Sequence, residues 1–507
     1  MVIKKKFLVF ASAVLILTLL LGCTPSVVPN GGVSTPDETS KPSDVSNEVE
    51  EMLSAQQWME MLEPYDYDGY NFTIATTKDK VFLVDEDASS MIDEAKDLRN
   101  EMVESKFGVN IVEKLYGAEE LLPEQSIAAL VNTAIADVVC APAEQMSVLA
   151  DNGLMLNLYS VPYLDLDAKY ISDKLLCQYT AENTAYMMFD DMIPYQANLW
   201  AVFYNNDIIK SFGLYDPYSH VKNGTWTWDL MLEMAKTVAP DELEDESRAE
   251  EQAEDESIFE ESTGEAPTVR YYGLASYYNE KEDLDLAYAM LSSMDGRFFG
   301  ETYQKQMSLS LDLGVATKAM DTFLGLFESK MHFDGDGNAA ITEFSEGRLL
   351  FYVYETSLAA ALANSKSDWG IAPLPKFSAE QEQYNSWLDL SAVALGVFNT
   401  NENTPRVGRI LNGLCAASYG HIAEATEMAY LNYYLRNNQS SLSLKNYVFA
   451  NPFVDVTFLY ASGIEDLRTL TLEHYNKAIL EGVNFEKKLF DEENKALADE
   501  LVSIKFK

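Results

Sequence analysis

The chain has 507 residues, of which 47% are hydrophobic, and carries a formal net charge of -45 at pH 7. This length allows two domains with substantial cores. Because so acidic a protein repels phosphate backbones and anionic lipid headgroups, nucleic acid and direct binding to a membrane surface are excluded as expected partners.

The N-terminal 22 residues have the pattern of a secretory signal: Lys4, Lys5 and Lys6 precede an apolar run that ends in small residues. The sequence Leu-Leu-Gly-Cys that ends at Cys23 resembles the bacterial lipobox. The resemblance implies cleavage before Cys23, acyl chains such as palmitate on the new terminus, and attachment to the outer face of the cytoplasmic membrane. A plain signal with an incidental cysteine is the alternative. Residues 23–67, rich in Pro, Ser and acid, are interpreted as the lipidated cysteine and a flexible tether.

The next part of the chain alternates strand-like apolar runs with amphipathic helical runs. This alternation predicts parallel β-α-β units with helices on both faces of a sheet. Ligands of such sheets bind beyond the carboxyl ends of the strands, which places Lys78 and Glu144 on one rim. Strands are expected at 72–76, 110–112 and 137–141, and helices at 88–107, 124–133 and 143–151.

The stretch from Trp200 to Lys236 contains a distinctive order of elements. A buried strand over 199–204 is followed by a short helix capped by Asn205, a turn at Asp216 and Pro217, and a helix that begins after Thr227. Asn, Asp and Thr side chains favour these positions because they accept hydrogen bonds from the free N–H groups of a first helical turn.

The remaining sequence predicts further strands and helices around one strongly acidic run. Residues 241–265 are almost purely acidic and are interpreted as a solvated insertion, against a calcium-binding or docking role. A strand is expected at 271–278 and a helix at 287–294.

Taken in this order, the landmarks resemble the extracellular solute-binding proteins of ABC importers, in particular the sugar-binding, maltose-binding-protein-like family 1. The resemblance implies an α/β, two-lobed periplasmic-binding-protein-like fold with hinge crossing strands and an interlobe ligand cleft. The first crossing would be 194–204, with Asn198 and Trp200 in the cleft, and the return crossing would be 387–398. The resemblance also implies a helix at 340–349, a strand at 350–355, an edge strand at 369–375, helices within 404–435 and a terminal helix at 485–504. Lobe I would comprise 68–193 and 390–440. Lobe II would comprise 194–389 and 441–507, with the acidic insertion at 240–266.

Sugar recognition needs aromatic planes together with planar side chains that bond hydroxyl groups. Two of the candidate residues also have a purely structural interpretation. Trp200 can belong to the hydrophobic core, and Glu144 can be a carboxylate that stabilises a helix N-terminus. The family's Gly-rich segment at the return crossing is replaced here by SWLDLS, residues 386–391, which leaves the ligand class open. The residues expected to bind ligand are Lys78, Glu144, Asn198, Trp200, Tyr277, Tyr354, Glu355, Trp387 and Asp389.

Enzyme and metal signatures are missing from the sequence. It contains no Walker A, G-x-S-x-G or H-E-x-x-H segment. The acidic loop at 334–338 lacks the glycine and glutamate spacing of an EF-hand. With Cys23 lipidated, the three remaining cysteines do not form a disulfide scaffold, and Cys140 is expected in the core. No catalytic residue, cofactor or metal is therefore expected.

The sequence thus predicts a lipid-anchored, monomeric substrate-binding protein that captures a carbohydrate, oligosaccharides included, and delivers it to ABC permease subunits without chemistry. A binding protein for peptides or other polar metabolites is the first alternative. A surface carbohydrate-active enzyme is a further one, because paired catalytic carboxylates escape detection in so acidic a sequence.

Overall fold

The computed structural model describes residues 53–84, 90–180, 183–240, 270–277, 282–301, 307–435, 437–460 and 473–482, all within one compact unit that begins at Leu53. The predicted signal sequence, Cys23, the acidic run and the helix at 485–504 lie outside these residues. None of the helices in the described ranges has the length and apolar character required to cross a membrane.

The first of two four-stranded sheets has the spatial order β11 (Val393–Gly396), β3 (Val138–Pro142), β1 (Tyr70–Thr76) and β2 (Val109–Leu115). Strand β1 is parallel to β2 and β3, as predicted from the alternation of strands and helices, and β11 pairs antiparallel to β3. Alternate residues of β1 such as Ile74 are fully buried, so the sheet lies inside the hydrophobic core.

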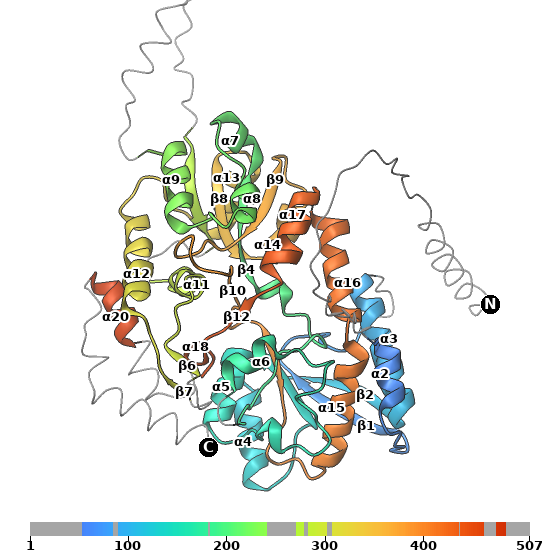
Figure 1. The fold of residues 1–507 in the computed structure, drawn as a ribbon. Helices are drawn as coiled ribbons and strands as arrows, with labels where there is room; N and C mark the ends of the chain where they lie inside the picture. Colours follow the sequence, from blue (N-terminus) through green and yellow to red (C-terminus); the bar gives the residue numbers. More distant parts are fainter. Residues whose placement is uncertain are drawn as a thin grey trace, which may run out of the picture. The chain divides into compact units, whose positions relative to one another are not determined.

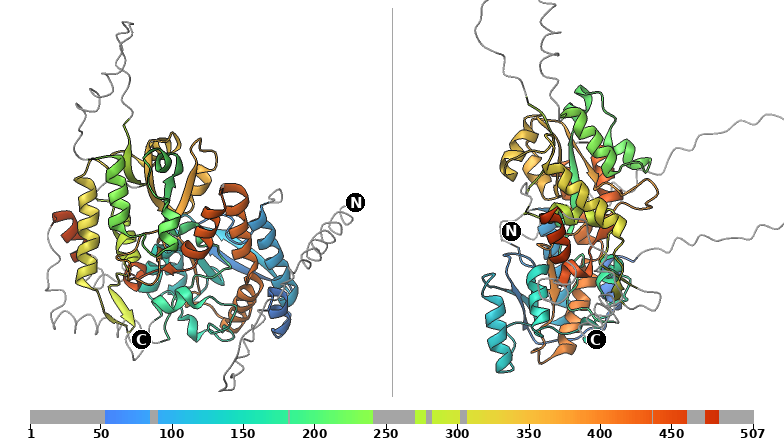
Figure 2. Two further views of the ribbon diagram at one scale, coloured as in Figure 1. Left: turned by 45° about the horizontal axis from the view of Figure 1, so that its top comes forward. Right: turned by 90° about the vertical axis from the view of Figure 1, so that its left-hand side faces the viewer.

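The second sheet has the order β5 (Tyr272–Ser276), β8 (Leu349–Glu355), β4 (Trp200–Asn205) and β9 (Trp369–Pro373), so β9 is an edge strand as expected. Strand β4 is antiparallel to both neighbours, and all six of its residues are buried. A continuous apolar run therefore marks a strand that is covered on both faces. The two sheets are separate in each view (Figure 1 and Figure 2).

Helices cover both sheets. Near the first sheet, α15 packs against α3 and α2, as Figure 1 shows, and α16 also contacts α3. Near the second sheet, α9 contacts β5 and α13 contacts β8. Their bounds are α2 Ala55–Met61, α3 Met91–Phe107, α4 Leu121–Leu130, α5 Ala143–Asp151, α6 Asp173–Tyr179, α7 Asn206–Ser211, α8 Pro217–Lys222, α9 Trp228–Val238, α13 Gly337–Ser345, α15 Thr404–Ser418 and α16 His421–Ala429.

The last part of the described chain contacts elements of both sheets. Helix α17 and the π-helical turn η4 contact β9, whereas α18 contacts α5 and α6. The remaining elements are η1 Leu158–Ser160, η2 Gln196–Asn198, α11 Asp285–Ser293, β6 Phe299–Glu301, β7 Met307–Leu309, α12 Leu313–Phe327, α14 Leu358–Leu362, β10 Ser386–Trp387, η3 Tyr430–Tyr434, α17 Asn438–Ser443, η4 Leu444–Val448, β12 Pro452–Phe453, α18 Val456–Tyr460 and α20 His474–Glu481.

Capping residues explain why some helices begin where the sequence predicted and others do not. Asn205 and Thr227 cap α7 and α9 as predicted. Asp216 and Pro217 do not form a simple turn: the Asp216 carboxylate caps α8, and Pro217 takes its first position, where no N–H is needed. Helix α3 begins at Met91 because Ser90 caps it. Helix α4 lies three residues earlier than predicted, over Leu121–Leu130.

The predicted return crossing over 387–398 is not one continuous strand. Strand β10 ends at Trp387, the chain turns where the Ala392 N–H donates to the Asp389 carbonyl, and β11 begins at Val393. Asn198, predicted inside the outward crossing strand, instead ends the 3-10 turn η2 that precedes β4. Short polar side chains favour such turns because they compete for local backbone hydrogen bonds.

The cysteines agree with the sequence analysis. Cys140 lies in β3 and is fully buried, as predicted. Cys140 and Cys415 are buried free thiols, and Cys177 is exposed.

Asn205 provides a test of the helix-capping argument. Its fully buried side chain accepts from the N–H groups of Asp207 and Ile208 and donates to the Phe344 carbonyl at 3.1 Å. We expect Asn205→Ala to lower the free energy of unfolding by about 1–3 kcal/mol, because buried polar groups lose their partners. Chemical denaturation measures this. The exposed Asn223, replaced by Ala, is the control, and an equal loss in both variants would contradict the prediction.

Candidate functional site

Two hydrogen bonds around Asp389 fix the turn after β10 to the start of β4, and a third closes the turn itself. The backbone N–H of Asp389 donates to the Asn198 carbonyl at 3.0 Å. One carboxylate oxygen of Asp389 accepts from the Trp200 indole N–H at 3.0 Å, and the other accepts from the Ser391 N–H at 2.8 Å. The turn therefore occupies a defined place beside the first residue of β4.

Glu355, the last residue of β8, lies opposite Trp200 in the strand register. Its side chain is 8% exposed and accepts hydrogen bonds from the Asn198 amide at 2.9 Å and from the hydroxyls of Ser357 and Ser391 at 3.0 and 3.1 Å. Burial, together with the negative charge of Asp389, raises the pKa of the Glu355 carboxyl. These hydrogen bonds partly offset the cost of placing a carboxylate there.

Aromatic rings lie beside these carboxylates. The rings of Tyr277 and Tyr354 are stacked with centroids 4.6 Å apart, and both side chains are partly exposed. Trp200 contacts Tyr354 edge-on at 5.5 Å and Trp387 at 5.2 Å. Trp200 and Trp387 are only 0% and 1% exposed. The two tryptophans are therefore buried and support the site by packing, whereas the rings of Tyr277 and Tyr354 are partly accessible to solvent.

Two loops of the first sheet reach the same turn. Lys78, after β1, donates from Nζ to the Ser391 carbonyl at 2.8 Å. Glu144, in the first turn of α5, donates from its backbone N–H to the Leu390 carbonyl at 3.4 Å. Hydrogen bonds and ring contacts thus join all nine predicted residues into one group around residues 389–391, which we call the candidate site.

Sequence reasoning missed Asp285, at the start of α11. Burial and the negative charges of Asp389, Asp283, Glu144 and Glu355 raise the pKa of its carboxyl to about 7. Ser391 was also missed, although the segment containing it was singled out. Asp285 gave no usable signal, because one more acid at a helix start is unremarkable in a chain with 81 acidic residues.

Several buried polar atoms at or beside the candidate site have no hydrogen-bond partner within the described part of the chain, among them the indole nitrogen of Trp387, the hydroxyl of Thr77 and the amide oxygen of Gln145. Thr77 adjoins Lys78, and Gln145 adjoins Glu144. Because buried polar groups are nearly always satisfied, we expect water or a bound solute to supply the missing partners.

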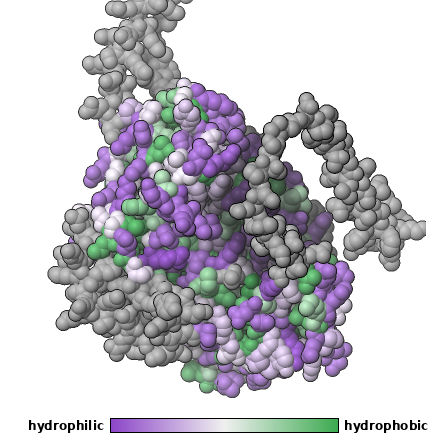
Figure 3. All heavy atoms as spheres, viewed as in Figure 1, coloured by the Kyte–Doolittle hydropathy of each residue, from purple (hydrophilic) through white to green (hydrophobic). Residues whose placement is uncertain are grey.

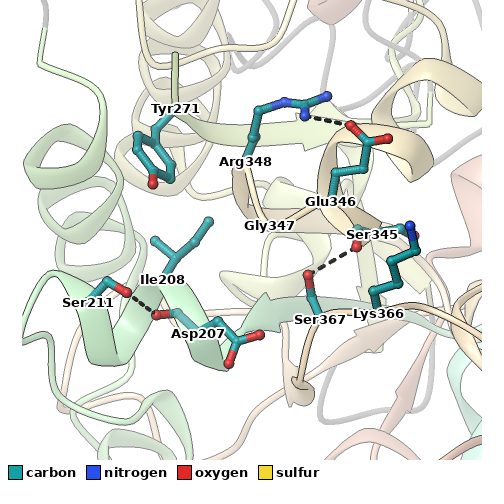
Figure 4. A pocket seen from close by; sticks show the side chains of 10 residues that line it. All are labelled: Asp207, Ile208, Ser211, Tyr271, Ser345, Glu346, Gly347, Arg348, Lys366 and Ser367. Carbon is teal, nitrogen blue, oxygen red and sulfur yellow. Dashed lines mark hydrogen bonds and ion pairs between the residues drawn. The ribbon is translucent and has the colours of Figure 1, made fainter. Parts of the chain in front are cut away.

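Two cavities lie elsewhere. One, of about 540 Å³, is drawn in Figure 4, where Asp207, Tyr271, Arg348 and Lys366 surround the hollow and Arg348 is paired with Glu346. The other, of about 320 Å³, is lined by Tyr70, Asp137 and Arg406. None of the nine predicted residues lines either cavity. The charges of Arg348 are matched by neighbouring glutamates, which leaves the aromatic and carboxylate groups of the candidate site as the better solute-binding chemistry.

The surface offers no competing apolar site on the face drawn in Figure 3. There the described residues are mostly hydrophilic, with small, separate apolar patches. Within the described ranges, no three His, Cys, Asp or Glu side chains are placed to hold a metal ion.

The fold is α/β, with two separate four-stranded sheets that are each covered by helices. Residues 103–409 match the bacterial extracellular solute-binding protein family, and the chain belongs to that family. The prediction of an extracellular solute-binding protein is therefore confirmed. No match is found among curated proteins.

Solved structures agree with this assignment at the level of the fold. The cyclic alpha-maltosyl-1,6-maltose binding protein of Arthrobacter globiformis is 13% identical with a TM-score of 0.53, over 86% of this chain and 100% of that one. A family 1 extracellular solute-binding protein from Bifidobacterium longum subsp. infantis is 14% identical with a TM-score of 0.51, over 86% and 99%. A cyclo/maltodextrin-binding protein complexed with maltotetraose is 13% identical with a TM-score of 0.50, over 86% and 97%. The predicted α/β, two-lobed solute-binding fold is confirmed.

The raised pKa of Asp285 predicts a pH-dependent stability difference. In the folded protein the Asp285 carboxyl keeps its proton to about pH 7, whereas in the unfolded chain it loses the proton near pH 4. As pH rises between these values, its contribution to the free energy of unfolding therefore becomes less favourable. We expect Asp285→Asn to become more stable than the parent protein as pH rises through this window, by about 1–2 kcal/mol after solvent screening, and then to level off.

Chemical denaturation at several pH values measures the difference. The exposed Asp321 on α12, replaced by Asn, serves as the control and should show no such trend. A pH-independent difference for Asp285→Asn would show that its carboxyl titrates normally.

Proposed function

We propose that this chain is the lipid-anchored substrate-binding protein of an ABC importer and captures a carbohydrate, oligosaccharides included. In this proposal lobe I comprises 68–193 with 390–440, and lobe II comprises 194–389 with 441–507. The protein acts as a monomer at the outer face of the cytoplasmic membrane and passes its solute to the permease subunits.

The convergence of groups from both sheets on residues 389–391 supports this proposal most directly. Lys78 and Glu144 come from loops of the first sheet, whereas Asn198 and Glu355 come from strand ends of the second. A solute bound to these groups makes contacts with both parts at once. It therefore binds more tightly when they are close together, which is the condition for closure driven by a ligand.

The chemistry of the candidate site suits a sugar. Stacked Tyr277 and Tyr354 offer ring surface to the apolar C–H face of a pyranose. The carboxylates of Glu355 and Asp389 and the amide of Asn198 are planar groups that bond hydroxyls. The same groups already bond one another here, so hydroxyls of a solute replace or extend existing hydrogen bonds.

The ligands of similar solved structures also support a carbohydrate. The Arthrobacter globiformis protein is named for cyclic alpha-maltosyl-1,6-maltose, and the maltodextrin-binding protein was solved with maltotetraose. We carry the carbohydrate class, and not the particular sugar, over to this chain. Membership in a binding-protein family supports solute capture without turnover.

Ligand-dependent stabilisation tests the carbohydrate. We expect mono- or oligosaccharides from a mixed panel to raise the melting temperature of the purified chain selectively, because a ligand that binds only the folded state at about 100 times its dissociation constant adds about 2.7 kcal/mol. Chromatography of the same mixtures detects products. No response across the panel, or turnover of the sugar, would contradict the proposal and favour a peptide or polar metabolite, or an enzyme.

The Asn198 amide tests whether binding occurs at the candidate site. Asn198→Ala removes its hydrogen bonds to Glu355 and Ser391 and is expected to weaken sugar binding by about 1–3 kcal/mol. Isothermal calorimetry with the sugar that stabilises the protein measures the loss. The exposed Asn223, replaced by Ala, is the matched control, and unchanged affinity in Asn198→Ala would place the sugar elsewhere.

Membrane fractionation tests the lipid anchor. Cys23→Ala removes the thiol that would carry the acyl chain, and the variant should move from the membrane fraction to the soluble fraction. Cys177→Ala, which changes an exposed thiol elsewhere, should remain with membranes. Persistent membrane association of Cys23→Ala would remove the lipoprotein assignment.

A further inference from the structure

We propose that Gly337 is a positioning residue of the candidate site: the absence of a side chain at this position seats the Tyr277 ring and thereby fixes the stack of Tyr277 on Tyr354. The inference rests on the proposed sugar-binding function and names a residue that acts on the solute through an aromatic ring. It depends on the close approach of Gly337 to Tyr277, on the ring stack, and on a hydrogen bond from Tyr352.

Two hydrogen bonds hold the backbone around Gly337, which is buried and is the first residue of α13. The Asp336 carboxylate caps the helix by accepting from the Ala339 N–H at 2.8 Å. The Gly337 carbonyl accepts from the hydroxyl of Tyr352 at 3.0 Å, and Tyr352 lies fully buried in β8. The backbone of Gly337 therefore has little freedom to move away from a crowded neighbour.

The ring of Tyr277 lies directly against this backbone. A Cβ atom at Gly337 would lie 2.5 Å from Cδ2 of Tyr277 and 2.8 Å from both Cε2 and Cγ. Carbon atoms that are not bonded pack at about 3.5–4.0 Å, so no side chain fits here while the ring keeps its place. The three distances are nearly equal, which places the Cβ position over the face of the ring and not at its edge.

Tyr354 covers the other face of the Tyr277 ring. The two rings are stacked, with an interplanar angle of 17° and centroids 4.6 Å apart. A ring face that carries the Gly337 backbone has no room for a second stacked ring, so Gly337 and Tyr354 lie on opposite faces. Tyr277 is thus the middle layer of three, and a solute reaches it at the ring edge.

Strand β8 sets the space that Tyr277 occupies. Tyr352 and Tyr354 are two residues apart on this strand, so their side chains lie on the same face of the second sheet. One of them holds the Gly337 carbonyl, and the other carries the Tyr277 ring. A methyl group at Gly337 therefore requires Tyr277 to move. Its movement disturbs Tyr354, whose ring contacts Trp200 within the candidate site.

The backbone conformation gives no other reason for glycine at this position. The φ angle of Gly337 is not positive, and the residue is helical. Alanine favours a helical backbone more than glycine does. The space taken by the Tyr277 ring is therefore what requires a residue without a side chain.

Calorimetry on Gly337→Ala, with the sugar that stabilises the parent protein, tests the proposal. We expect about three- to tenfold weaker binding, because the added methyl group displaces a stacked ring. Gly325→Ala on α12 is the matched control: Gly325 is exposed, a Cβ there meets open space, and binding should equal that of the parent. Parent affinity in Gly337→Ala would overturn the positioning role and leave the carbohydrate function intact. If the parent protein binds no sugar, both proposals fail.

A second background separates displacement of the ring from a general effect of alanine on α13. Tyr277→Ala opens the space that the methyl group needs, so Gly337→Ala should then change affinity by less than about twofold. The melting temperature without sugar gives the same comparison where affinity is too low to measure. There Gly337→Ala should lower the value in the parent and not in Tyr277→Ala. An equal effect of Gly337→Ala in both backgrounds would overturn the proposal.

Discussion

The hydrogen bond from the Trp200 indole to the Asp389 carboxylate connects the start of β4 to the turn between β10 and β11. That turn leads from β10, which pairs with β12, into β11 of the first sheet, and the Ser391 carbonyl within it accepts a hydrogen bond from the Lys78 ammonium. Because one fully buried tryptophan fixes the turn, residues far apart in sequence meet at one place. The arrangement of the whole candidate site depends on this contact.

Burying carboxylates destabilises the folded protein, and the interactions that offset this differ between Glu355 and Asp285. Glu355 has three side-chain donors, from Asn198, Ser357 and Ser391, which stabilise its charge. Asp285 is opposed by four carboxylates and keeps its proton to about pH 7. Such local destabilisation is typical of binding sites, since groups that satisfy each other fully have little to offer a ligand.

The sequence predicted the fold well because periodicity and caps are local signals. The apolar run of β4 and the Asn205 and Thr227 caps could be recognised without any tertiary information. Long-range effects could not. The segment WLDLSAVALGVF was expected from the family resemblance to be one return crossing, and Asp389 and Ser391 within it in fact form a turn between two strands.

The candidate site was predicted as a set of residues, and its detailed roles were not. All nine residues lie together, yet Trp200 and Trp387 are buried supports, and Asp285 escaped notice among many acids. A carboxylate on a helix start acquires its meaning only when α11 brings it beside β10 and the carboxylates of other elements. The charge balance of a site is therefore a tertiary property.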